Sequence, residues 1–157
     1  MIELVVDDGA AMEALGARLA PLLEAGDLVL LDGELGAGKT TFTRGLGAAL
    51  GARGAITSPT FVLARTHPTA SGVPLVHVDA YRLGSAAEVE DLDLDWDGAI
   101  VVVEWGSGKV DVVDRSFLRV AIERPVGGDP LAEDAPRRVT VEGVGPRWVR
   151  LDADLAK

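Results

Sequence analysis

A glycine-rich segment early in the chain has the residue types and the spacing that bind phosphate groups. It fits the pattern G-x-x-x-x-G-K-[ST] and follows an apolar run at residues 28–31. A buried strand, a glycine-rich turn and a helix in this order direct backbone N–H groups at a phosphate chain. Glycines are needed because side chains resist a tight turn with positive φ. We therefore predict a nucleoside-triphosphate site made of Gly33, Glu34, Leu35, Gly36, Ala37, Gly38, Lys39, Thr40 and Thr41.

Two side chains of this segment indicate its chemistry. Lys39 is expected to reach the β- and γ-phosphates, and the Thr40 hydroxyl to ligate Mg²⁺. The chain has only three lysines, the others being Lys109 and Lys157, which makes the match to the pattern more specific. The guanine-binding pattern N-K-x-D does not occur in the sequence, which favours ATP over GTP.

Two acidic residues stand at the ends of predicted strands and are candidates for the rest of the site. Asp79 follows the run 75–78, and Glu104 follows the run 100–103. A phosphate site of this kind needs an acid on a neighbouring strand to complete the Mg²⁺ shell. One acid could hold the metal while the other orients the attacking water, and the residues alone leave the two roles open.

A loop rich in hydroxyl groups follows the second predicted helix. It contains Thr57, Ser58, Pro59 and Thr60. Nucleotide switches place a loop hydroxyl where it senses the γ-phosphate and the metal. Pro59 would hold the preceding residue in an extended conformation. The segment is therefore predicted to respond to the bound nucleotide, although a plain turn has the same composition.

The hydropathy pattern predicts elements that could position these residues. Apolar periodicity indicates helices at about 10–24, capped near Asp8, at 39–50, ending at Gly51, and at 86–92. Strands are expected at about 2–6, 28–31, 61–65, 74–79, 99–103, 117–123, 138–142 and 148–151. His67 is expected in a solvated turn, and Trp96 and Trp148 in packing roles. We predict one α/β domain over residues 1–157, a three-layer P-loop NTPase-type sheet with helices on both faces, a parallel core, and antiparallel strands in the C-terminal part.

Composition narrows the classes of function. The chain has 157 residues, no cysteine and a formal net charge of −10. The absence of cysteine excludes disulfides, thiol catalysis and cysteine-bound zinc. No apolar run is long enough to span a membrane and no signal peptide is seen, so a cytoplasmic protein is expected. The acidic balance argues against a chain that grips nucleic acid by itself.

The motifs occur together in an order that resembles the TsaE (also called YjeE) family of small bacterial ATPases in tRNA threonylcarbamoyladenosine biosynthesis. Four segments carry the resemblance, which extends over nearly the whole chain. They are GELGAGKTT at 33–41, SPTF at 58–61, HVDAYRL at 77–83 and VEW at 103–105.

The resemblance implies that the protein supplies ATP hydrolysis in making the threonylcarbamoyl group at adenosine 37 of tRNAs that read codons beginning with A. It implies two partners, TsaD, which transfers the group, and TsaB, which scaffolds it, with tRNA contacted mainly through them. It also implies that Lys39 lies on the phosphates, that Thr40 and Glu104 hold Mg²⁺, and that Asp79 is needed for hydrolysis. Trp105 would lie beside the nucleotide, and Ser58, Pro59, Thr60 and Phe61 would form a mobile switch-like loop.

Two other functions are compatible with a phosphate loop. A small-molecule kinase would need an acceptor pocket and an arginine-bearing lid, for which the only candidate is the loop 125–136 flanked by Arg124 and Arg137. A non-hydrolytic switch would use ATP only to dock a partner.

Overall fold

The structure is a computed structural model that describes residues 1–34, 36–54, 56, 64–80, 94–104, 115–124 and 136–155. Its helices are α1 (Gly9–Leu19), α2 (Lys39–Leu50) and α4 (Leu151–Leu155), with 3-10 turns at Ala20–Leu22 and Pro146–Trp148. Its strands are β1 (Ile2–Val6), β2 (Leu28–Gly33), β3 (Ala64–His67), β4 (Leu75–Asp79), β5 (Ile100–Glu104), β6 (Phe117–Glu123) and β7 (Arg137–Val144).

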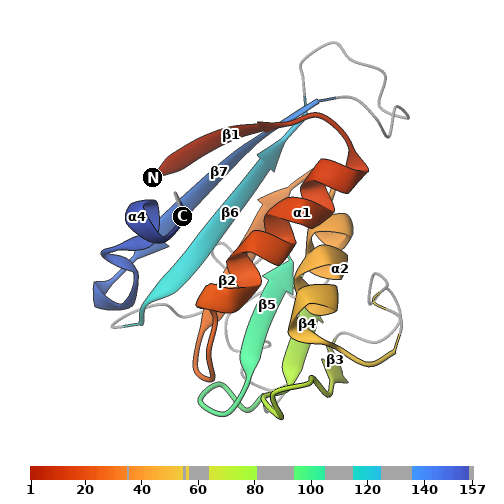
Figure 1. Cartoon of the computed structure of the whole chain (residues 1–157), viewed down its shortest axis with the longest axis vertical. Helices are drawn as coiled ribbons and strands as arrows, with labels where there is room; N and C mark the ends of the chain where they lie inside the picture. Colours follow the sequence, from red (N-terminus) through yellow and green to blue (C-terminus); the bar gives the residue numbers. More distant parts are fainter. Residues whose placement is uncertain are drawn as a thin grey trace.

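The strands form one seven-stranded sheet in the order β1-β7-β6-β2-β5-β4-β3 (Figure 1). The pairs β4–β5, β5–β2 and β2–β6 are parallel. The pairs β1–β7, β6–β7 and β3–β4 are antiparallel. The predicted α/β fold class, with a parallel core and antiparallel strands in the C-terminal part, is therefore confirmed.

Both faces of the central strands are buried, as the continuous apolar runs in their sequences require. All five residues of β5 are buried, and so are the first four of β2. The helices α1, α2 and α4 contribute to one hydrophobic cluster, on the side drawn in front in Figure 1. The other face has its own cluster, and the helix predicted at 86–92 lies outside the described residues. That second cluster consists of Leu28, Leu30, Val76, Val78, Ala80, Ala99, Val101 and Val103.

Local signals in the sequence explain where the two main helices begin and end. The side chain of Asp8 accepts a hydrogen bond of 2.8 Å from the N–H of Ala11, so it caps α1 as predicted. Gly51 ends α2 with a φ of 72°, the left-handed conformation that glycine adopts without strain. The helix α1 is shorter than the predicted helix at 10–24, because the chain continues after Leu19 in a 3-10 turn that contains Pro21.

Two predictions at the edges of the sheet were wrong. The strand expected at 148–151 is instead a 3-10 turn followed by α4, in which Leu151 and Leu155 are both buried at helical spacing. His67 is not a solvated turn residue: it ends β3 with a buried side chain, and its Nδ1 lies 3.1 Å from the carbonyl oxygen of Arg53. The packing role predicted for Trp148 is confirmed, because it is buried in the cluster on the helix side.

The helices α1 and α2 pack closely because a glycine of each faces the backbone of the other. A Cβ atom on Gly16 would overlap the carbonyl oxygen of Phe42 and lie 2.8 Å from the N atom of Leu46. A Cβ atom on Gly45 would overlap the carbonyl oxygen of Glu13. In the described part of the chain no helix has the length and apolarity needed to cross a membrane.

This helix contact can be tested with alanine substitutions. Gly16→Ala should lower the free energy of unfolding by about 1–3 kcal/mol, because the added methyl group forces the two backbones apart. Gly9→Ala is the matched control in the same helix, since its Cβ would meet only a methyl group of Thr41 at 3.9 Å. Alanine is the better helix former, so the control should be neutral or slightly stabilising. Urea denaturation measures both, and equal stability of the two variants would contradict the close packing.

Candidate functional site

The phosphate loop predicted from the sequence connects β2 to α2 and needs glycine at three positions. Gly36 and Gly38 have positive φ angles of 75° and 119°, which side chains resist. A Cβ atom on Gly33 would lie 2.8 Å from the carbonyl oxygen of Ile122 on β6. The loop is thus held tightly against the sheet, and the N–H groups of the first turn of α2 have no acceptor within the helix. This arrangement suits an anionic ligand.

Lys39 lies folded over the loop. Its side chain is almost fully buried, and Nζ donates hydrogen bonds of 2.6 Å to the carbonyl oxygen of Gly33 and 2.9 Å to that of Glu34. Burial lowers the pKa of Lys39, and the nearby carboxylates of Glu104, Asp79 and Asp32 oppose that change. The ammonium group is therefore placed at the loop by two carbonyl acceptors and three surrounding acids.

The register of the parallel strands brings the predicted acids to the loop. Glu104 at the end of β5 pairs with Leu31 of β2 on one side and with Asp79 of β4 on the other. Glu104 is buried, and its Oε1 accepts a long hydrogen bond of 3.4 Å from the hydroxyl of Thr40. A nucleotide-bound Mg²⁺ takes a hydroxyl and a carboxylate as protein ligands, and Thr40 and Glu104 offer these two groups within hydrogen-bonding distance of each other.

Sequence reasoning gave no role to His77, which contacts this carboxylate. His77 is fully buried, and its Nε2 lies 2.6 Å from Oε2 of Glu104. Among the described residues its Nδ1 has no hydrogen-bond partner. The sequence spacing could have indicated this position. Side chains two residues apart on a strand lie on the same face of the sheet, so His77 shares a face with Asp79. Its position indicates that it orients the Glu104 carboxylate.

Two arginines that sequence reasoning placed only beside the loop 125–136 also meet the phosphate loop. A Cβ atom on Gly36 would lie 3.0 Å from Nη2 of Arg124. Arg137 is buried, and its Nε donates a hydrogen bond of 3.2 Å to the carbonyl oxygen of Ala37. These contacts join β6 and β7 to the loop.

The structure therefore brings Lys39, Thr40, Asp79 and Glu104 to one edge of the sheet with the loop residues Gly33, Glu34, Gly36, Ala37 and Gly38, and with Thr41 in the first turn of α2. The predicted roles of these residues stay predictions. Several others lie outside the described residues: Leu35, the switch-like loop of Ser58, Pro59, Thr60 and Phe61, and Trp105.

Comparisons with known proteins agree on one family. The model of the family described as "Threonylcarbamoyl adenosine biosynthesis protein TsaE" matches residues 6–127. A curated Streptomyces coelicolor protein named tRNA threonylcarbamoyladenosine biosynthesis protein TsaE is 58% identical over 148 residues, covering 92% of this chain and 98% of its own. A protein of the same name from Bacillus subtilis is 33% identical over 147 residues, covering 92% and 87%.

The fold is also shared with a solved structure. The crystal structure of Bacillus subtilis YdiB matches with a TM-score of 0.74 and 27% sequence identity, covering 99% of this chain and 93% of that one. The predicted class, a P-loop NTPase-type fold, is thereby supported by sequence and by three-dimensional likeness.

The contact between His77 and Glu104 leads to a testable prediction, for which His67 provides the control. His77→Ala should lower the free energy of unfolding by about 3 kcal/mol, because it removes a donor from a buried carboxylate. If Glu104 holds Mg²⁺ as predicted from the sequence, the substitution should also reduce the Mg²⁺-dependent part of ATP affinity, because Glu104 loses its orientation. His67→Ala removes a buried histidine whose contact is a backbone carbonyl, and should lower stability without changing the Mg²⁺ effect.

Urea denaturation and ATP titrations with and without Mg²⁺ separate the two outcomes. An unchanged Mg²⁺ dependence in His77→Ala would mean that the histidine serves packing alone.

Proposed function

The chain belongs to the TsaE family, and from that membership and its site we propose that it is a Mg²⁺-dependent ATPase required to form the threonylcarbamoyl group on adenosine 37 of tRNAs reading codons that start with A. The observation that carries the proposal is the meeting of Lys39, Thr40, Asp79 and Glu104 at the carboxyl edge of the parallel strands, beside the glycine loop. That edge is where ligands bind in sheets of this type.

The residues present fit both ATP and Mg²⁺. Gly33 tolerates no side chain, and Gly36 and Gly38 hold positive φ angles, so the backbone is shaped to approach a phosphate chain. Thr40 and Glu104 supply the hydroxyl and the carboxylate for a metal that also takes phosphate oxygens. When bound, Mg²⁺ would neutralise charge that develops on the phosphates.

Different side chains of the protein have different roles in the proposed hydrolysis. Lys39, whose ammonium group is held at the loop by two carbonyl oxygens, would donate to phosphate oxygens and meet their negative charge. Glu104, oriented by His77, would hold the metal together with Thr40. Asp79, at the end of the next strand, orients the water that accepts the γ-phosphoryl group. Catalysis of this kind depends on position and charge.

The partners proposed are TsaD and TsaB, in the cytoplasm. A net charge of −10 argues against a chain that binds tRNA by itself. We therefore propose that tRNA is contacted mainly through the partners, and that the partners stimulate a low activity of the isolated chain.

The role of Lys39 is tested by Lys39→Ala. ATP turnover should fall by about 10²-fold or more, because the buried ammonium that meets the developing charge is lost. Lys157→Ala removes the same charge elsewhere and should leave turnover unchanged. Steady-state phosphate release measures both variants. Normal turnover and nucleotide affinity in Lys39→Ala would refute the assignment of the phosphate loop.

The metal ligand and the partner dependence are tested together. Phosphate release is measured for the chain alone and with its TsaB and TsaD, in wild type, Glu104→Ala and Glu123→Ala. Glu123 is the matched control, because it is an exposed acid that also ends a parallel strand. We expect the partners to stimulate wild type and Glu123→Ala but not Glu104→Ala. ATP consumption that needs a small hydroxyl compound instead of the partners would favour a kinase.

A further inference from the structure

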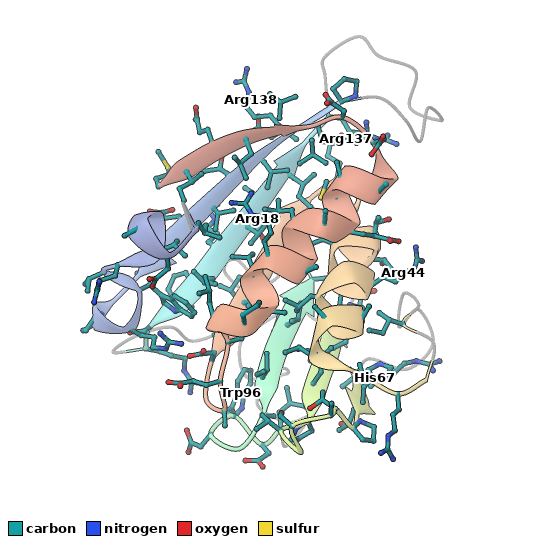
Figure 2. All side chains as sticks on the ribbon, viewed as in Figure 1. Arg18, Arg44, His67, Trp96, Arg137 and Arg138 are labelled. Atoms are coloured by element: carbon teal, nitrogen blue, oxygen red, sulfur yellow. The ribbon has the colours of Figure 1, made fainter. Side chains whose placement is uncertain are left out.

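The phosphate loop lies between strands whose ends carry acidic residues on one side and arginines on the other. On one side of β2, the strands β5 and β4 end in the acids Glu104 and Asp79. On the other side, Arg124 follows β6 and Arg137 begins β7. Because β7 runs antiparallel to β6, it starts at the edge where β6 ends. Figure 2 shows Arg137 at this end of β7, beside the start of α1.

Arg137 acts on the backbone of the loop. Its Nε donates to the carbonyl oxygen of Ala37, and the side chain is buried although it is charged. The C=O and N–H groups of a trans peptide point in opposite directions. A donor that holds the carbonyl of Ala37 on the β7 side therefore turns the N–H of Gly38 away from β7.

Arg124 reaches the neighbouring loop residue. A Cβ atom on Gly36 would lie 3.0 Å from its Nη2 and 3.6 Å from its Cζ, so the guanidinium group covers the open side of this glycine. The two arginines thus meet adjacent residues of one loop, in a chain whose net charge is −10. Burial and the positive charge of Arg124 both lower the pKa of Arg137. The two guanidinium groups therefore repel one another, and an anion that binds beside them would offset this repulsion.

We propose that Arg124 and Arg137 form the second, cationic half of the phosphate site, with Arg124 binding the phosphate chain of the nucleotide and Arg137 fixing the Ala37–Gly38 peptide for it. This inference rests on the proposed function, because it names further binding and positioning residues of the same site. Guanidinium groups suit such a role, since they stay charged when buried and match phosphate oxygens with paired donors.

The alternative role for Arg124 is a structural contact that only supports the loop. The two roles differ in what they predict for ligand binding. Removing a supporting contact lowers the unfolding temperature. Removing a side chain that binds the phosphate chain reduces the stabilisation that the ligand provides.

The experiment compares Arg124→Gln with Arg138→Gln. Arg138 is the next residue along β7 from Arg137, is exposed, and carries the same charge, so its substitution controls for net charge. Affinities for Mg²⁺-ATP and for inorganic tripolyphosphate are measured by calorimetry, and unfolding temperatures are recorded with and without each ligand. Arg137→Gln is measured in the same way, and Arg124→Lys retains the charge without the paired donors.

We expect Arg124→Gln to weaken the binding of both ligands by about tenfold to a hundredfold, as for the loss of a charge-assisted hydrogen bond. The rise in unfolding temperature that each ligand causes should be smaller than in wild type. Arg138→Gln should bind both ligands normally, and Arg124→Lys should recover part of the loss. Loss of affinity in Arg137→Gln with retained folding would support the positioning of the Gly38 N–H group.

Three results would overturn the inference. Equal affinities of Arg124→Gln and wild type would exclude a contact between this side chain and the phosphates. Weaker binding of ATP with unchanged binding of tripolyphosphate would place Arg124 at another part of the nucleotide. A lower ligand-free unfolding temperature with normal affinities would leave only the structural role. A wild-type chain that binds neither ligand would instead refute the proposed function itself.

Discussion

The buried carboxylate of Glu104 is the constraint around which the site is arranged. Burying a charge is costly unless hydrogen bonds or opposite charges accompany it. Here His77 lies 2.6 Å from one oxygen, Thr40 lies 3.4 Å from the other, and Lys39 is close enough for its pKa to respond. These partners come from β4 and from the first turn of α2. The position of the helix, the loop and the neighbouring strand is thus tied to one acid at the end of a fully buried strand.

The positions in the candidate site that follow from sequence are those set by residues close together along the chain. Residues 33–41 are read as one segment, because a glycine loop and a helix start are local structures. The position of Asp79 and Glu104 at one edge followed from another local rule, that parallel strands end together, and the register of β4 and β5 pairs these two residues directly. Two buried strands ending in acids were enough to indicate that geometry.

What sequence reasoning missed depends on contacts between distant residues. His77 received no role from the sequence, because nothing local shows that its ring meets a carboxylate on another strand. Arg124 and Arg137 seemed only to flank a loop, because their convergence on Gly36 and Ala37 depends on the antiparallel return of β7. The errors at His67 and at 148–151 also concern contacts that are not local. The His67 ring lies against the carbonyl oxygen of Arg53, and Leu151 and Leu155 pack into the core on the helix side.

The mixed topology of the sheet therefore has a chemical consequence. A loop at the end of a central parallel strand has neighbours on both sides, and here one side supplies acids while the other supplies arginines. A phosphate chain with its metal needs both, because the metal requires carboxylate and hydroxyl ligands and the phosphate oxygens require donors. An antiparallel β7 places its first residue, Arg137, at the edge where the parallel strands end, whereas a parallel strand would place its last residue there. The C-terminal strands thus extend the cationic side of the loop without any change to the parallel core that holds the acids.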